Sequence, residues 1–202
     1  MKTLSQNDPD TLREAVKTVR NGGVIVLPTE TVYGLACRWD DAAARERIYA
    51  LKRRPSNKLL QMLAADLPQA AAFGVAVTPP LERLAAAFWP GPLTAVAPAT
   101  GAWPTIGLRL PDHPFVQALL REGGLALAAT SANLSGEPPA TTLADAIVHL
   151  DGAPDLAIDG GAISVTGGRA STVVSLLNET PALLREGTLS LADINHALGN
   201  TP

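Results

Sequence analysis

The chain has 202 residues, 47% hydrophobic and 17% charged, which is ordinary for a water-soluble globular protein of one domain. A single cysteine excludes an internal disulfide and a cysteine-rich metal site, and the formal net charge of −3 argues against a protein coated with nucleic acid over its whole surface. The opening residues hold no apolar signal core, and no run of about 18 apolar residues occurs, so we expect a cytoplasmic protein without a membrane span.

Helices and strands are predicted to alternate along the chain. Asp8 and Pro9 predict the start of a helix that ends at Gly22-Gly23. Further helices are predicted at about residues 41–53, 67–73, 80–88, 114–122, 143–150 and 189–198. Short apolar runs predict buried strands at about residues 24–27, 59–64, 93–97, 106–110, 125–129, 156–158 and 172–177. The interleaving predicts an α/β fold: one domain over residues 1–202, built on a twisted mixed sheet of parallel and antiparallel strands flanked by helices.

Polar side chains are concentrated in residues 28–35 (PTETVYGL), directly after the first predicted strand. Ligands of open α/β sheets bind beyond the carboxyl ends of strands, so two threonines, Glu30 and a tyrosine at this point favour a site. A polar turn between Pro28 and Gly34 explains the same eight residues, and both readings remain open. Nothing in the chemistry that follows requires Glu30 as a base.

Basic residues cluster between positions 45 and 58. Glu46 is the only acid among them, and the basic members are Arg45, Arg47, Lys52, Arg53, Arg54 and Lys58. Such a cluster suits a phosphate-bearing ligand or a single RNA contact. A solvated helix face is the plain alternative.

Motifs for covalent or metal-dependent catalysis are missing from the sequence. It contains no P-loop, no GxGxxG and no GxSxG, and its three histidines do not have metal-binding spacing. What remains is a set of hydroxyls, amides and cations: Arg109, Ser131 and Asn133 at or just after predicted strand ends, and Ser171 and Arg185 further along the sequence. Phosphoryl and nucleotidyl transfer use such groups, because positioning and cationic stabilisation of phosphate supply most of the catalysis there. Singly, each residue also fits a turn, a strand or the surface.

In order along the chain, these segments resemble the YrdC-like family of L-threonylcarbamoyladenylate synthases. The resemblance covers nearly the whole chain and rests on residues 28–35 (PTETVYGL), 52–55 (KRRP), 89–94 (WPGPLT), 109–114 (RLPDHP), 130–136 (TSANLSG), 159–161 (DGG), 171–174 (STVV) and 184–187 (LREG). His113, inside one of these motifs, is expected to cap the following helix. Eight motifs in matching order are far more specific than any single one.

The resemblance implies a reaction and a fold. L-threonine, bicarbonate and ATP would give threonylcarbamoyl-AMP and pyrophosphate with the help of Mg²⁺. Partner proteins would then transfer the threonylcarbamoyl group to adenosine 37 of tRNAs that read ANN codons, and direct contact between tRNA and this chain is possible. The implied fold is a twisted sheet around a large, positively charged cavity. The chain resembles the short, single-domain bacterial form.

The resemblance also implies site residues. Thr31, Arg109 and Ser171 would bind L-threonine. ATP would be bound by Lys52, Arg54, Lys58, Thr105, Ser131, Asn133, Thr141 and Arg185. No residue is expected to act as acid, base or nucleophile, and no protein side chain is expected to bind the metal, which would arrive on the ATP phosphates.

The sequence departs from the family pattern at a few positions, and two other functions remain open. Ser175 stands where the family often has an acidic residue, and Leu63 stands where longer relatives carry a histidine. One alternative is a non-catalytic module for double-stranded RNA or tRNA, which would bind RNA in a strongly salt-dependent way. The other, a carbamoyl-transfer module of hydrogenase maturation, fits poorly because those proteins carry a zinc-finger region that one cysteine cannot supply.

Overall fold

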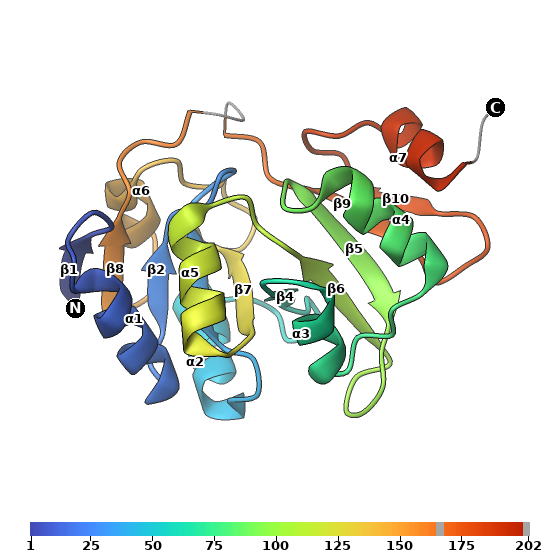
Figure 1. Ribbon diagram of the computed structural model, residues 1–202. Helices are drawn as coiled ribbons and strands as arrows, with labels where there is room; N and C mark the ends of the chain where they lie inside the picture. The colour runs from blue at the N-terminus through green and yellow to red at the C-terminus, as the bar shows by residue number, and fades with distance from the viewer. Residues whose placement is uncertain (165–167, 200–202) are drawn as a thin grey trace.

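The computed structural model describes residues 1–164 and 168–199, which fold into one long sheet with helices packed against it (Figure 1). The strands of this described part are β1 (Lys2–Ser5), β2 (Ile25–Leu27), β3 (Gly34–Arg38), β4 (Gln61–Leu63), β5 (Leu93–Pro98), β6 (Thr105–Arg109), β7 (Leu127–Ser131), β8 (Leu156–Asp159), β9 (Thr172–Ser175) and β10 (Ala182–Arg185). The helices are α1 (Thr11–Arg20), α2 (Ala42–Lys52), α3 (Leu67–Ala72), α4 (Pro79–Phe88), α5 (Pro114–Gly123), α6 (Leu143–Val148) and α7 (Leu191–Leu198).

The strands follow the spatial order β1-β8-β2-β3-β7-β4-β6-β5-β9-β10 in the described part of the chain. The pairs β1–β8, β2–β8, β4–β6 and β5–β9 are parallel. The pairs β2–β3, β3–β7, β4–β7, β5–β6 and β9–β10 are antiparallel. The predicted α/β fold with a mixed sheet is therefore confirmed.

Alternation along the strands divides the core into two layers. On β2, Ile25 and Leu27 belong to a cluster that contains the buried residues of α1 and α5, whereas Val26 belongs to the larger cluster with α2, α4 and α7. Successive side chains of a strand point to opposite faces, so an apolar strand buried on both sides supplies both layers. Figure 1 shows α1 beside α5 at one end of the sheet, and α4 beside α7 at the other.

The same alternation gives strands β6 and β5 one polar face. Ile106 and Leu108 are buried in the larger cluster, whereas Thr105, Gly107 and Arg109 line a cavity. On β5 the buried Leu93, Ala95 and Ala97 alternate with Thr94 and Val96, which line the same cavity. One side of these strands therefore builds the core, and the other presents hydroxyls and a guanidinium.

Three strands were not predicted, and one helix begins later than expected. Strands β1 and β10 were missed because they lie at the two edges of the sheet and their side chains are largely exposed, which removes the apolar pattern. Strand β3 begins inside the 28–35 motif, where turn residues obscure it. Helix α1 starts at Thr11 with Asp10 as its N-cap, because Asp8 lies in a turn where its N–H donates to the carbonyl of Ser5.

His113 occupies the predicted N-cap position of α5, but its side chain makes no capping hydrogen bond. The prediction that His113 caps this helix is confirmed for its backbone, while its imidazole takes no part in the cap. Its backbone carbonyl does begin the helix, accepting from the N–H of Gln117 at 2.9 Å.

Candidate substrate site

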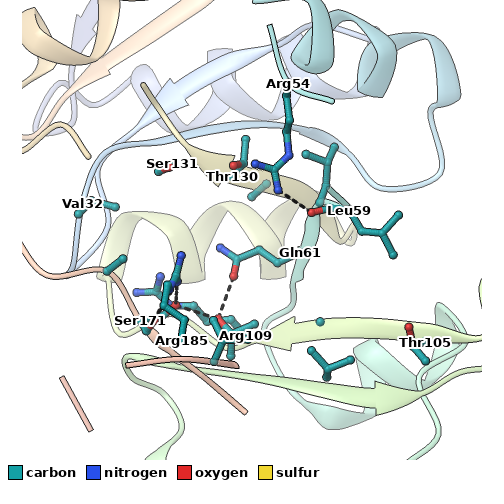
Figure 2. Close-up of a pocket in the computed structure, with 17 residues that line it drawn as sticks. Val32, Arg54, Leu59, Gln61, Thr105, Arg109, Thr130, Ser131, Ser171 and Arg185 are labelled. Carbon is teal, nitrogen blue, oxygen red and sulfur yellow. Dashed lines mark hydrogen bonds between the residues drawn. The ribbon is translucent and has the colours of Figure 1, made fainter. Parts of the chain in front are cut away.

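A cavity of about 320 Å³ lies between the end of β7, strands β4, β6 and β5, and the chain before β9 (Figure 2). Its polar lining in the described residues consists of Arg54, Gln61, Thr94, Thr105, Arg109, Thr130, Ser131, Ser171 and Arg185. No aspartate or glutamate belongs to the described lining. The cavity therefore presents cations and hydrogen-bond donors, as an anionic ligand requires.

The structure brings six of the eleven predicted site residues to this cavity: Arg54, Thr105, Arg109, Ser131, Ser171 and Arg185. Thr31, Lys52 and Asn133 lie buried just outside the lining. Lys58 is exposed and Thr141 is half-buried, and neither belongs to the described lining. The carbonyl of Thr141 accepts from the N–H of Ile163 at 2.8 Å, which places it under the segment that follows β8.

Arg109 is held by the 28–35 motif. One terminal nitrogen, Nη2, donates to Glu30 Oε1 at 2.7 Å and to Thr31 Oγ1 at 2.8 Å. The guanidinium is buried, and neither Arg109 Nε nor Glu30 Oε2 has a hydrogen-bond partner among the described residues. Glu30 thus compensates the buried charge of Arg109 from outside the cavity lining, while Arg109 itself belongs to that lining.

The other polar groups of the 28–35 motif build the loop itself. Thr29 Oγ1 donates to the carbonyl of Val32 at 2.6 Å and accepts from the N–H groups of Thr31 and Val32. Tyr33 Oη donates to the carbonyl of Gly161 at 2.7 Å and accepts from the N–H of Gly160 at 3.0 Å. Residues 28–35 therefore combine the two interpretations left open by the sequence. They form a hydrogen-bonded turn, and they position the guanidinium that lines the cavity.

Lys52, the last residue of α2, reaches under the loop that follows β7. Its Nζ donates to the carbonyl oxygens of Ser131 and Asn133, and Asn133 Oδ1 lies 3.4 Å away. Burial, with a smaller contribution from the nearby Arg54 cation, lowers the pKa of Lys52 to about 7, whereas the surrounding oxygens favour its charged form. Asn133 Nδ2 is used inside the loop, donating to the carbonyls of Leu134 and Glu137.

A chain of side chains crosses the cavity from β10 to β4. Arg185 Nη2 donates to Ser171 Oγ at 3.1 Å and to the carbonyl of Ser171 at 2.8 Å. Ser171 Oγ lies 2.9 Å from Thr94 Oγ1, which lies 2.9 Å from Gln61 Oε1. Sequence reasoning missed Gln61 and Thr94, although a glutamine inside the apolar run 59–64 is an unusual residue for a buried strand.

The three guanidiniums of the lining act on one another. Partial removal from water lowers the pKa of Arg185, and the positive charges of Arg109 and Arg54 lower it further. Burial also lowers the pKa of Arg54, whose Nε donates to the carbonyl of Lys58 at 2.8 Å and whose Nη2 donates to that of Leu59 at 2.9 Å. Like charges gathered in this way are stabilised by an anion, which the cavity has room to hold.

Of the basic residues in the cluster 45–58, only Arg54 belongs to the described lining of this cavity. Arg47 lies 2.8 Å from Asp155, and Arg53 lies 2.8 Å from Asp151. Arg45 packs over the ring of Trp103, with 4.4 Å between its Cζ and the ring centre. Arg47 and Arg53 are therefore paired with carboxylates of the fold and Arg45 with an aromatic ring, which weakens the case for an RNA-binding face built on this cluster.

A second cavity, of about 200 Å³, adjoins the first. Trp39 and Trp103, whose ring centres lie 5.2 Å apart edge to face, line it together with Tyr49. Thr105 and Gly107 line both cavities, so the two spaces meet above strand β6.

The described residues contain neither a cluster of metal ligands nor a membrane-spanning helix. No group of three or more histidines, cysteines, aspartates or glutamates lies close enough to hold a metal ion in residues 1–164 and 168–199. In the same residues, no helix has the length and apolar character needed to cross a membrane.

Most of the chain matches a known protein family. Residues 17–187 match the family model of Sua5, YciO and YrdC, whose description is "Telomere recombination". The threonylcarbamoyl-AMP synthase of Bacillus subtilis is 38% identical over 206 residues, which cover 97% of this chain and 58% of that protein. The chain thus spans somewhat more than half the length of this curated relative.

Solved structures of the family superpose closely on this one. Sua5 of P. abyssi, in a crystal structure with L-threonine, has a TM-score of 0.89 at 33% identity and covers 98% of this chain and 61% of its own. YciO of E. coli has a TM-score of 0.83 at 30% identity, and the match covers 96% of this chain and 97% of YciO. The match therefore covers nearly all of the YciO chain but only the larger part of the Sua5 chain.

Proposed function

This chain belongs to the Sua5, YciO and YrdC family, and we propose that it is a threonylcarbamoyl-AMP synthase. It would convert L-threonine, bicarbonate and ATP into L-threonylcarbamoyladenylate and pyrophosphate, a nucleotidyl transfer. The name of the B. subtilis relative and the L-threonine bound to P. abyssi Sua5 support this choice of reaction.

The observation that carries the proposal is the convergence of Arg54, Arg109 and Arg185 on one cavity whose described lining has no carboxylate. Every substrate of the proposed reaction carries anionic oxygen. Guanidinium groups bind carboxylate and phosphate through paired hydrogen bonds, so the lining suits all of them.

The proposed chemistry needs no protein nucleophile. The threonine amine attacks the carbon of bicarbonate, water leaves, and a carbamate forms. One carbamate oxygen then attacks the α-phosphorus of ATP in line, and pyrophosphate leaves with the electrons of the broken P–O bond. No histidine, cysteine, aspartate or glutamate belongs to the described lining, which supports catalysis by proximity and charge stabilisation rather than by a single base.

Arg109 is assigned to the threonine carboxylate. Glu30 and Thr31 hold one end of its guanidinium, while Nε has no partner in the described residues. Arg54 and Arg185 would face the triphosphate, and Ser131 and Ser171 would donate to its oxygens. Mg²⁺ would be bound by the phosphates, because the described lining offers it no carboxylate ligand.

The product would be consumed by other proteins. A mixed anhydride of a carbamate and AMP is a reactive acyl donor, and we propose that partner proteins transfer its threonylcarbamoyl group to adenosine 37 of ANN-decoding tRNAs in the cytoplasm. Direct contact of tRNA with this chain belongs to the same proposal.

The decisive experiment is the release of pyrophosphate from ATP with Mg²⁺, measured with and without L-threonine and with and without bicarbonate. We expect release only when all are present. Folded protein that releases none overturns the proposal. Tight, salt-sensitive binding of RNA by such an inactive protein would instead establish the non-catalytic alternative.

A further inference from the structure

Gln61 is the polar exception in strand β4. Leucines precede it, and Met62 and Leu63, which follow it, are buried in the core. Gln61 itself lines the cavity, beside Gly107 and opposite Ala129 of β7. A polar residue in such a strand lowers stability unless its amide is used, because each amide group removed from water needs a partner.

The direction of the hydrogen bonds around Gln61 follows from the donors available. Arg185 can only donate, so Ser171 Oγ accepts from it. Ser171 is buried, and the one described acceptor for its hydroxyl hydrogen is Thr94 Oγ1. Thr94 must then donate its own hydrogen to Gln61 Oε1. The order Arg185 to Ser171 to Thr94 to Gln61 is the one in which every hydroxyl hydrogen is used.

This order fixes the orientation of the Gln61 amide. Its oxygen accepts from Thr94, so its nitrogen, Nε2, carries two hydrogens on the other side. Figure 2 shows that nitrogen turned away from the bond, toward the open part of the pocket that Arg54, Arg109 and Ser131 also line. Among the described residues Nε2 has no hydrogen-bond acceptor. Arg185 thus acts through two hydroxyls to hold a neutral donor in place.

We propose that Gln61 Nε2 binds an anionic oxygen of a substrate in this cavity. The oxygen belongs to a carboxylate, a bicarbonate or a phosphate, which share this acceptor chemistry. The choice of L-threonine, bicarbonate and ATP as the molecules that carry these groups rests on the proposed function. The donor role of Gln61 rests on the hydrogen-bond chain alone.

The test measures binding of L-threonine, bicarbonate and pyrophosphate, each alone, by calorimetry and by the side-chain amide signals in NMR spectra. Gln61→Met keeps the length of the side chain and removes the donors. We expect it to weaken one of the three ligands by on the order of tenfold, the size of a lost hydrogen bond to a charged group, and to leave the others within about twofold. Gln61→Glu still accepts from Thr94 but presents a negative oxygen, and we expect it to weaken the same ligand more.

A matched pair at Thr94 tests the orientation. Thr94→Ser keeps the hydroxyl, and we expect wild-type affinity. Thr94→Val removes it and frees the amide to turn, and we expect a loss for the ligand that Gln61→Met selects. Full affinity of folded Gln61→Met for all three ligands overturns the proposal, as does a Gln61 amide signal that does not move in wild-type protein saturated with each ligand.

Failure of the two proposals is distinguishable. If wild-type protein binds one ligand through Gln61 but releases no pyrophosphate, the proposed function fails and the donor role stands. If pyrophosphate is released and Gln61→Met keeps the wild-type KM for every substrate, the donor role fails and the function stands.

Discussion

Glu30 Oε1 lies 2.7 Å from Arg109 Nη2, and the two side chains are only 11% and 3% exposed. This ion pair joins the loop after β2 to the end of β6, which are far apart in the sequence. A buried charge that loses its partner costs far more than an exposed one. The pair therefore ties the shape of the cavity to the stability of the fold.

Glu30→Ala is expected to lower the free energy of unfolding by about 3 kcal/mol, because it leaves the Arg109 guanidinium buried without a counter-charge. Glu30→Gln keeps an acceptor for Arg109 and is expected to be milder. Urea unfolding measures both. Asp151→Asn is the control, since its ion pair with Arg53 is exposed and its removal is expected to change little. Equal effects of Glu30→Ala and Asp151→Asn would contradict this account.

Arg109→Lys is expected to reduce kcat/KM for L-threonine by about 10- to 100-fold, the range for one or two hydrogen bonds to a charged group. A lysine keeps the charge but has no planar fork to serve Glu30, Thr31 and a ligand together. Steady-state pyrophosphate release at varied L-threonine measures the change. An unchanged kcat/KM would remove Arg109 from the threonine site.

Lys52→Met is expected to loosen the loop after β7, rather than to remove a direct contact with ATP. The Lys52 amine donates to the carbonyls of Ser131 and Asn133, which would be left buried without this donor. We expect faster amide hydrogen exchange in residues 131–137 and a loss of stability of about 2 kcal/mol. If exchange there is unchanged while ATP affinity falls, Lys52 contacts phosphate directly instead.

Cys37 is expected to resist alkylation in the folded protein. Burial raises the pKa of its thiol from 9.0 to about 12, so the reactive thiolate is scarce at pH 8.5. The pKa of this thiol is higher in the folded protein than in the unfolded one. Its contribution to the free energy of unfolding is therefore complete below pH 9 and is lost as the pH rises from about 9 towards 12. Iodoacetamide labelling with and without urea measures the first effect. The pH dependence of unfolding, compared with Cys37→Ala, measures the second, and identical curves would contradict it.

The fold was largely predictable because its buried strands are continuous apolar runs between glycine and proline residues. Helix α2 (Ala42–Lys52) lies within one residue of its predicted bounds at each end, because the Asp41 side chain caps its start and Pro55 prevents its continuation. Edge strands such as β10 carry no such pattern, since half of their surroundings is solvent.

The site was predictable in its residues and less so in their contacts. The sequence placed Arg109 at the end of a predicted strand and singled out Arg185 without predicting strand β10, which carries it. It could not show that Glu30 faces Arg109, because that pairing depends on β4 and β6 being parallel neighbours and on β3 lying two strands from β4. Nor could it show the link from Arg185 to Gln61, whose members come from four separate segments.

Gly107 lies on strand β6 and has room beside it for a larger residue. A methyl group placed there would meet nothing closer than 3.5 Å, so the strand accepts alanine without moving its neighbours. Because Gly107 lines both cavities, a side chain placed there would take up space where the aromatic cavity and the cationic cavity adjoin. We therefore expect a larger residue at position 107 to reduce the space for a ligand while leaving in place the arginines that supply the charge.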